Sequence, residues 1–175
     1  MPDIHSPRTR VRALLSFFIV ALLLAGLTAF PLQWELALLY QWAPFFEHVA
    51  PSLVEWIGLV NRAIQESYGR YSFLAYGTDW LAFAHIVIAI AFVGPLRDPV
   101  RNIWVVEWGM IACVLIVPLA LIMGPVRGIP LFWTVVDCSF GVFGIIPLWF
   151  CRRETLRLEQ EDKSRRQEAR SLSVA

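Results

Sequence analysis

Four long apolar runs constrain this chain more than any other feature of its sequence. They extend roughly over residues 11–30, 78–94, 103–123 and 131–150. Each is close to the length of about 20 residues that a helix needs to cross the hydrocarbon core of a bilayer. With 58% hydrophobic and 17% charged residues, the chain is also too apolar for an ordinary soluble domain. The sequence therefore predicts an all-α integral membrane protein with four transmembrane helices.

Arginines border these runs mainly on one side of the predicted membrane. Eight of them precede the first run, lie between the second and third, or follow the fourth: Arg8, Arg10, Arg12, Arg97, Arg101, Arg152, Arg153 and Arg157. The other side receives Arg62, Arg70 and Arg127. Tryptophans lie near the predicted helix ends, where indoles prefer the headgroup level. By the positive-inside rule we expect an antiparallel four-helix bundle, with both termini in the cytoplasm of a bacterial-type inner membrane.

The first run could instead be the core of a signal peptide, because basic residues precede it. Its apolar stretch is longer than a usual signal core, and cleavage after Ala29 would place Leu27 where a small residue is preferred. We therefore expect residues 1–151 to form one four-helix transmembrane domain. Residues 152–175 mix both charges with few apolar side chains, which predicts a charged cytoplasmic tail that frays after a short extension of the last helix.

The loop of residues 31–77, on the predicted outer side, is long enough to have a shape of its own. Ser52, with Glu55 three residues later, has the pattern of a capping box. Behind it, apolar residues recur at helical spacing: Leu53, Trp56, Ile57, Val60 and Ile64. This predicts an amphipathic helix over 52–66, with its apolar stripe at the outer surface of the membrane or on the bundle. The stretch 32–42 could form a second, shorter one.

Ionisable residues inside the runs are candidates for function, because a charge in lipid is costly unless it is paired. His85 lies six positions after Asp79, and Asp137 six after Leu131, so both should lie roughly 9 Å below the outer edge of the bilayer. Equal depth predicts a polar pocket in the outer leaflet built from His85, Asp137 and Cys138, in which the carboxylate orients or charges the imidazole. A His–Asp hydrogen bond that only locks the helices together fits the same pattern.

Two further carboxylates have structural interpretations. Asp79 follows Thr78 at the start of the second run, where a carboxylate can cap the helix and complement its dipole. Glu107 lies about one turn into the third run, where it can pair with Arg101 or Arg152. We therefore expect Asp79, Glu107 and Arg101 to serve in capping or ion pairing.

No cofactor, metal or nucleic-acid partner is predicted. Of the three histidines only His85 lies in a run, so a haem held by two histidines is not expected. The three cysteines form neither a metal-ligand pattern nor a disulfide framework, and nucleotide-binding and nucleophile motifs are absent. The net charge of +1 provides no extended basic face for nucleic acid.

Three classes of function are compatible with these patterns. The first is an accessory or assembly subunit that binds lipid, another membrane protein or a second copy of the chain, as the aromatic outer loop and the small residues Gly141 and Gly144 suggest. The second is a small proton-linked transporter or channel component that uses His85 and Asp137, although no repeat relates the two halves of the chain. The third is a membrane enzyme acting on a lipid or quinone, with His85 as its acid–base group. The enzyme is ranked last because no nucleophile or metal set accompanies the histidine, and we expect the first class.

Overall fold

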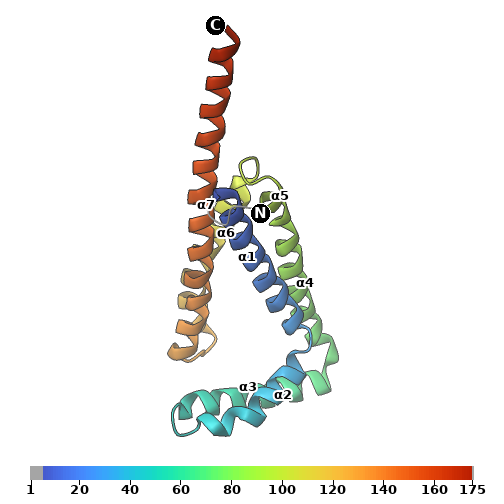
Figure 1. The fold of residues 1–175 in the computed structure, drawn as a ribbon. Helices are drawn as coiled ribbons and strands as arrows, with labels where there is room; N and C mark the ends of the chain where they lie inside the picture. The colour runs from blue at the N-terminus through green and yellow to red at the C-terminus, as the bar shows by residue number, and fades with distance from the viewer. Residues whose placement is uncertain (1–5, 175) are drawn as a thin grey trace. The chain divides into compact units, whose positions relative to one another are not determined.

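The computed structural model describes residues 6–174, and all regular secondary structure in that range is helical. The elements are α1 Pro7–Ala29, α2 Leu32–Trp42, η1 Ala43–Phe46, α3 Pro51–Arg70, η2 Ser72–Leu74, α4 Ala75–Ala91, α5 Val93–Arg97, α6 Ile103–Val126 and α7 Leu131–Val174 (Figure 1). They belong to two compact units. Unit 1 comprises the chain up to Val20 together with the segment from Ile90 onward, and unit 2 comprises Ala21–Ala89.

Four helical stretches of the described chain are long and apolar enough to cross a membrane. They are Pro7–Ala29, Ser72–Arg97, Ile103–Val126 and Leu131–Leu172, and each contains one of the predicted runs or nearly all of it. The second stretch begins earlier than predicted, because η2 and the first three residues of α4 precede Thr78. The Thr78 hydroxyl lies 2.7 Å from that of Tyr68. Their length and composition agree with a multi-pass membrane protein.

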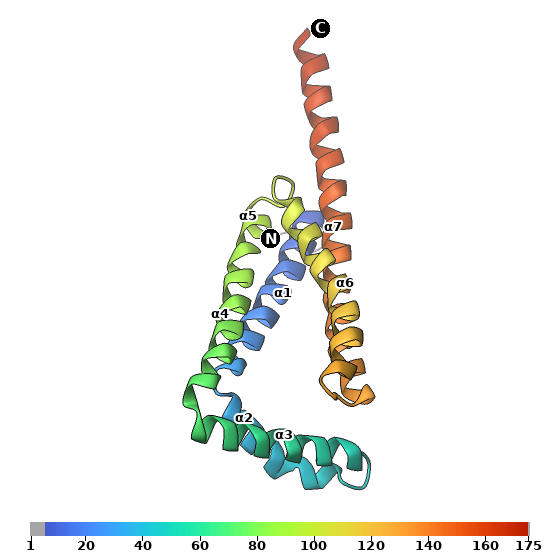
Figure 2. The ribbon, with the colours of Figure 1, turned by 180° about the vertical axis from the view of Figure 1, so that it is seen from behind.

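In unit 2, α2 and α3 fold back on each other as a hairpin joined through η1 (Figure 2). We call residues 32–70 the α2–α3 hairpin. α3 begins at Pro51, which suits the first helical position because the backbone N–H there has no partner inside the helix. Ala50 is the N-cap residue and no side chain caps the helix, so the capping box predicted at Ser52 and Glu55 is wrong. The helix is also longer than the predicted 52–66.

The apolar stripe of α3 is partly covered by α2. Ile57 is buried, and the Tyr40 ring lies so close to Gly58 that an added Cβ would be 3.1 Å from its Cε2. The side-chain amide of Gln65 donates a hydrogen bond of 2.9 Å to the carbonyl oxygen of Gln33. The stripe therefore packs partly within the hairpin, and aromatic side chains of α2 and η1 stay exposed.

In unit 1, α6 and α7 lie side by side and run in opposite directions (Figures 1 and 2). The turn between them contains Gly128, whose φ of 69° is one that side chains disfavour. Small residues bring the two helices together at successive levels, where Gly124 meets Thr134, Gly141 meets the carbonyl of Cys113, and Gly109 meets Leu148. The fully buried ring of Phe92 covers Gly109 and lies 4.8 Å from that of Phe18, centroid to centroid.

α7 is one helix of 44 residues, whereas the sequence predicted a tail that frays soon after residue 151. The composition of the tail conceals a buried stripe. Its residues are separated by alternating steps of three and four, as on one face of a helix: Leu148, Cys151, Thr155 and Leu158. Further along, Glu159 forms an ion pair of 2.6 Å with Lys163, which lies one helical turn later on the same side of the helix as Glu159. The buried stripe and the local ion pair support the helix as far as Lys163.

Candidate functional site

His85 lies on α4 in unit 2, at a close crossing with the second half of α1. An added Cβ at Gly26 would be 2.9 Å from the carbonyl oxygen of Ala82 and 3.0 Å from the Cβ of His85. The imidazole Nδ1 lies 2.8 Å from the carbonyl oxygen of Leu81. Because a carbonyl can only accept, this hydrogen bond places a proton on Nδ1 and leaves Nε2 available as a donor or acceptor. The half-buried ring is thus anchored to its own helix.

Asp137 and Cys138 lie on α7 in unit 1 and are both half-buried. The structure shows no hydrogen bond or ion pair for the Asp137 carboxylate among the residues it describes. On the same turn of α7, the Ser139 hydroxyl donates a hydrogen bond of 2.6 Å to the carbonyl oxygen of Val136. His85 belongs to the other unit, so the outer-leaflet pocket that combines it with Asp137 and Cys138 stays a prediction.

The other sequence candidates lie at helix ends. α4 begins at Ala75, so Asp79 lies past its first turn, which contains no acidic residue, and the predicted cap is not formed there. Glu107 accepts a hydrogen bond of 2.8 Å from Nε of Arg152, one of the two partners that the sequence offered. The other candidate, Arg101, donates its backbone N–H to a carboxylate in the turn before α6.

Five arginines from different parts of unit 1 surround one cavity of about 470 Å³. They are Arg8 and Arg12 of α1, Arg97 at the end of α5, Arg101 in the turn before α6, and Arg166 of α7. The remaining lining consists of Asp98, Pro99, Val100, Leu158 and Asp162. We call this cavity the arginine pocket. It is the most polar concave site in the described part of unit 1 for which the structure gives a lining.

Helical spacing explains how these side chains come to share one cavity. Arg8 and Arg12 are one turn apart on α1, and residues four apart lie on the same face of a helix. On α7, Leu158, Asp162 and Arg166 are separated by the same interval, and Leu158 is buried at the base of this row. The end of α5 and its connection to α6 contribute Arg97 and Arg101 to the same lining.

The pocket is strongly basic. Five arginines and two aspartates give its lining a formal charge of +3. Both carboxylates already have partners, since Asp98 Oδ1 accepts the Arg101 backbone N–H at 3.1 Å and Asp162 Oδ1 pairs with Arg8 at 3.5 Å. Among the described residues, four guanidinium groups of the lining show no ion pair: Arg12, Arg97, Arg101 and Arg166.

No family model, curated protein or solved structure matches this chain. We therefore infer function from its own surfaces. In residues 6–174 no group of three or more His, Cys, Asp or Glu side chains could hold a metal ion. The arginine pocket was missed from the sequence, although four of its arginines had been placed on one side of the membrane. Arg166 was overlooked because the tail was expected to fray, and the helical spacing of Leu158, Asp162 and Arg166 is the signal that could have revealed it.

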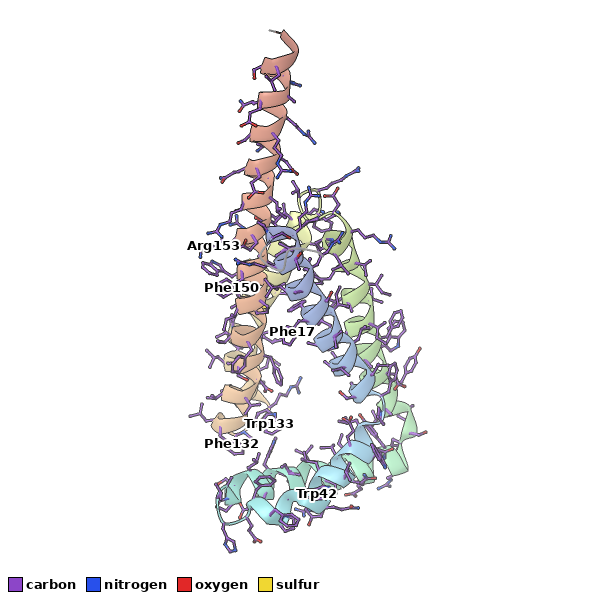
Figure 3. All side chains as sticks on the ribbon, viewed as in Figure 1. Phe17, Trp42, Phe132, Trp133, Phe150 and Arg153 are labelled. Carbon is purple, nitrogen blue, oxygen red and sulfur yellow. The ribbon has the colours of Figure 1, made fainter. Side chains whose placement is uncertain are left out.

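The α2–α3 hairpin presents a second feature, an exposed aromatic surface. Trp34 is 66% exposed, Trp42 57% and Phe45 75%, and Phe46 and Val49 follow them in the connection to α3. Trp42, labelled in Figure 3, is the last residue of α2, and its ring lies 5.6 Å from that of Phe45, centroid to centroid. We call Trp34, Trp42, Phe45, Phe46 and Val49 the aromatic surface of the hairpin.

Proposed function

We propose that this chain is an accessory or assembly subunit of a cell inner membrane and acts by binding another membrane protein. Its four spans pack as an antiparallel bundle with both termini in the cytoplasm, and the hairpin with its amphipathic helix lies at the outer surface. The arrangement of arginines along the sequence supports this orientation, because eight of them border the spans on the same predicted side.

The observation that carries the proposal is the aromatic surface of the hairpin. The hairpin packs its own stripe internally through Ile57 and Tyr40, yet leaves several large aromatic side chains without cover from its own unit. Tryptophan, tyrosine and phenylalanine are enriched where proteins bind each other, since they bury a large area at a small cost in side-chain entropy. The hairpin holds no group of metal-ligating side chains that would favour a chemical role.

Site-specific photocrosslinking in intact membranes tests the proposal. A photoreactive residue at Phe45 should give one discrete protein adduct, whereas the same residue at Glu66, which is exposed on α3, should give little or none. In protein purified in mild detergent, Trp34→Ala with Trp42→Ala should release the same partner, and Glu66→Ala should retain it. Adducts to lipid alone at Phe45 would show that the aromatic side chains serve only to anchor the hairpin at the headgroups.

A further inference from the structure

We propose that the arginine pocket binds the phosphate of an anionic phospholipid headgroup. The proposal concerns unit 1 and a ligand of defined chemistry, whereas partner binding by the hairpin concerns unit 2. Either can therefore fail while the other holds. Three steps lead to it: the charge of the pocket, the geometry of its donors, and its position at the ends of the spans.

The net positive charge of the lining favours binding of an anion. Bringing several guanidinium groups around one cavity is electrostatically unfavourable, and the repulsion is removed when an anion lies between them. Asp98 and Asp162 offset only two of the five positive charges, which leaves a formal charge of +3 around the cavity. The four arginines without an ion pair provide more positive charge than one monoanionic ligand requires.

The donors suit a phosphate group. The guanidinium group is planar and presents paired N–H donors that match two oxygens of a phosphate, so arginine is preferred where phosphate is bound. Arg97 and Arg101 come from the end of α5 and its connection to α6, and Arg166 comes from α7, so their guanidinium groups can contact different oxygens of one tetrahedral group. A volume of about 470 Å³ also exceeds what a bare phosphate needs and lies within the range of sites for larger organic ligands.

The position of the pocket favours lipid as the source of that phosphate. Arg97 ends the second candidate span, and Arg101 lies just before the third, which begins at Ile103. The pocket therefore lies at the level where a spanning helix meets the headgroups, and basic pockets between spanning helices bind anionic headgroups. Its apolar lining, from Pro99, Val100 and Leu158, can cover the glycerol and the first carbons of the acyl chains.

The test compares neighbouring arginines of α7. Arg166 lines the pocket and Arg165 does not, although both are exposed on the same stretch of helix. Full-length protein in an uncharged detergent is titrated with short-chain phosphatidylglycerol, and the apparent Kd is obtained from the rise in unfolding temperature. Arg166→Gln, and Arg97→Gln with Arg101→Gln, should each raise the Kd, by roughly tenfold for every arginine removed. Arg165→Gln should leave the Kd within about twofold of wild type.

Two further arms identify the source of the phosphate. Short-chain phosphatidylcholine, which has no net charge, should stabilise the protein equally in wild type and all variants. Inorganic phosphate tests a soluble source. If it stabilises wild type with the same dependence on Arg97, Arg101 and Arg166, while phosphatidylglycerol adds nothing, the anion site stands and the lipid assignment is overturned. If neither ligand stabilises the protein, or if Arg165→Gln weakens binding as much as Arg166→Gln, the site itself is overturned. Circular dichroism before titration shows that each variant is folded.

Discussion

The closest approach of α6 and α7 provides a stringent test of the packing. Cys113 faces two glycines of α7 with different parts of its structure. An alanine at Gly141 would meet the backbone carbonyl of Cys113, and an alanine at Gly144 would meet its Sγ at 2.9 Å. The backbone cannot move without shifting α6, whereas a side chain can be removed by mutation. We therefore expect Cys113→Ala to relieve Gly144→Ala but not Gly141→Ala.

The magnitudes follow from two opposing effects. Replacing glycine by alanine inside a helix favours folding by up to about 1 kcal/mol through helix propensity. Inserting a methyl group into a filled contact costs about 1–3 kcal/mol. At Gly77, where nothing lies within 4 Å, only the first effect acts, and Gly77→Ala should be neutral or stabilising. At Gly141 the second effect should dominate and destabilise the protein by about 1–2 kcal/mol, or roughly 2–8 °C in unfolding temperature.

The assay is a pair of double-mutant cycles, with unfolding followed in a single detergent. We expect a favourable coupling of about 1 kcal/mol between Gly144→Ala and Cys113→Ala. The Gly141→Ala and Cys113→Ala changes should be additive within about 0.5 kcal/mol. Rescue of Gly141→Ala by Cys113→Ala, or a Gly141→Ala protein as stable as Gly77→Ala, would refute the proposed backbone contact.

Three other outcomes are expected. Glu107→Gln and Arg152→Gln should each lower the free energy of unfolding by less than about 1 kcal/mol, because the two side chains are 42% and 41% exposed. A coupling energy well above ~1 kcal/mol in a double-mutant cycle would indicate a more buried pair. Leu158→Ala should lower the free energy of unfolding by about 2 kcal/mol or more, because the Leu158 side chain is 4% exposed. Leu172 is 80% exposed, so Leu172→Ala should leave the stability unchanged. Equal effects of the two changes in thermal unfolding would contradict the buried stripe of α7. A reporter enzyme fused after the final residue should be active only in the cytoplasm, and periplasmic activity would reverse the proposed orientation.

The four candidate membrane-spanning helices could be predicted from the sequence because hydrophobic length alone specifies them. Runs such as 103–123 need about 20 apolar residues in any arrangement, so no tertiary knowledge is required. Local helix starts were less predictable. The Ser52–Glu55 pattern is typical of a capping box, but Pro51 can itself occupy the first helical position and moves the start by one residue. Thr78 similarly looked like a boundary, although Ala75 already begins α4.

The sequence did not reveal which residues of distant segments meet in the fold. The polar pocket of His85 and Asp137 stays a prediction, because it relies on equal depth and depth alone does not decide which faces of two helices meet. The arginine pocket depends on contacts such as Arg8 with Asp162, which are 154 residues apart. The tail was interpreted by its composition, which is charged, when its periodicity at Thr155 and Leu158 would have indicated a buried face.

The continuity of α7 has a mechanical consequence. Its 44 residues extend for about 66 Å, more than twice the thickness of the hydrocarbon core, which is about 30 Å. No turn separates the apolar half of α7 from the half beyond Cys151, although Pro147, a residue that can bend a helix, lies just before that point. A tilt of about 10° within the bilayer would displace the far tip by about 6 Å over the roughly 35 Å of helix outside it. A small reorientation of the apolar half would therefore be enlarged at the far end of the helix.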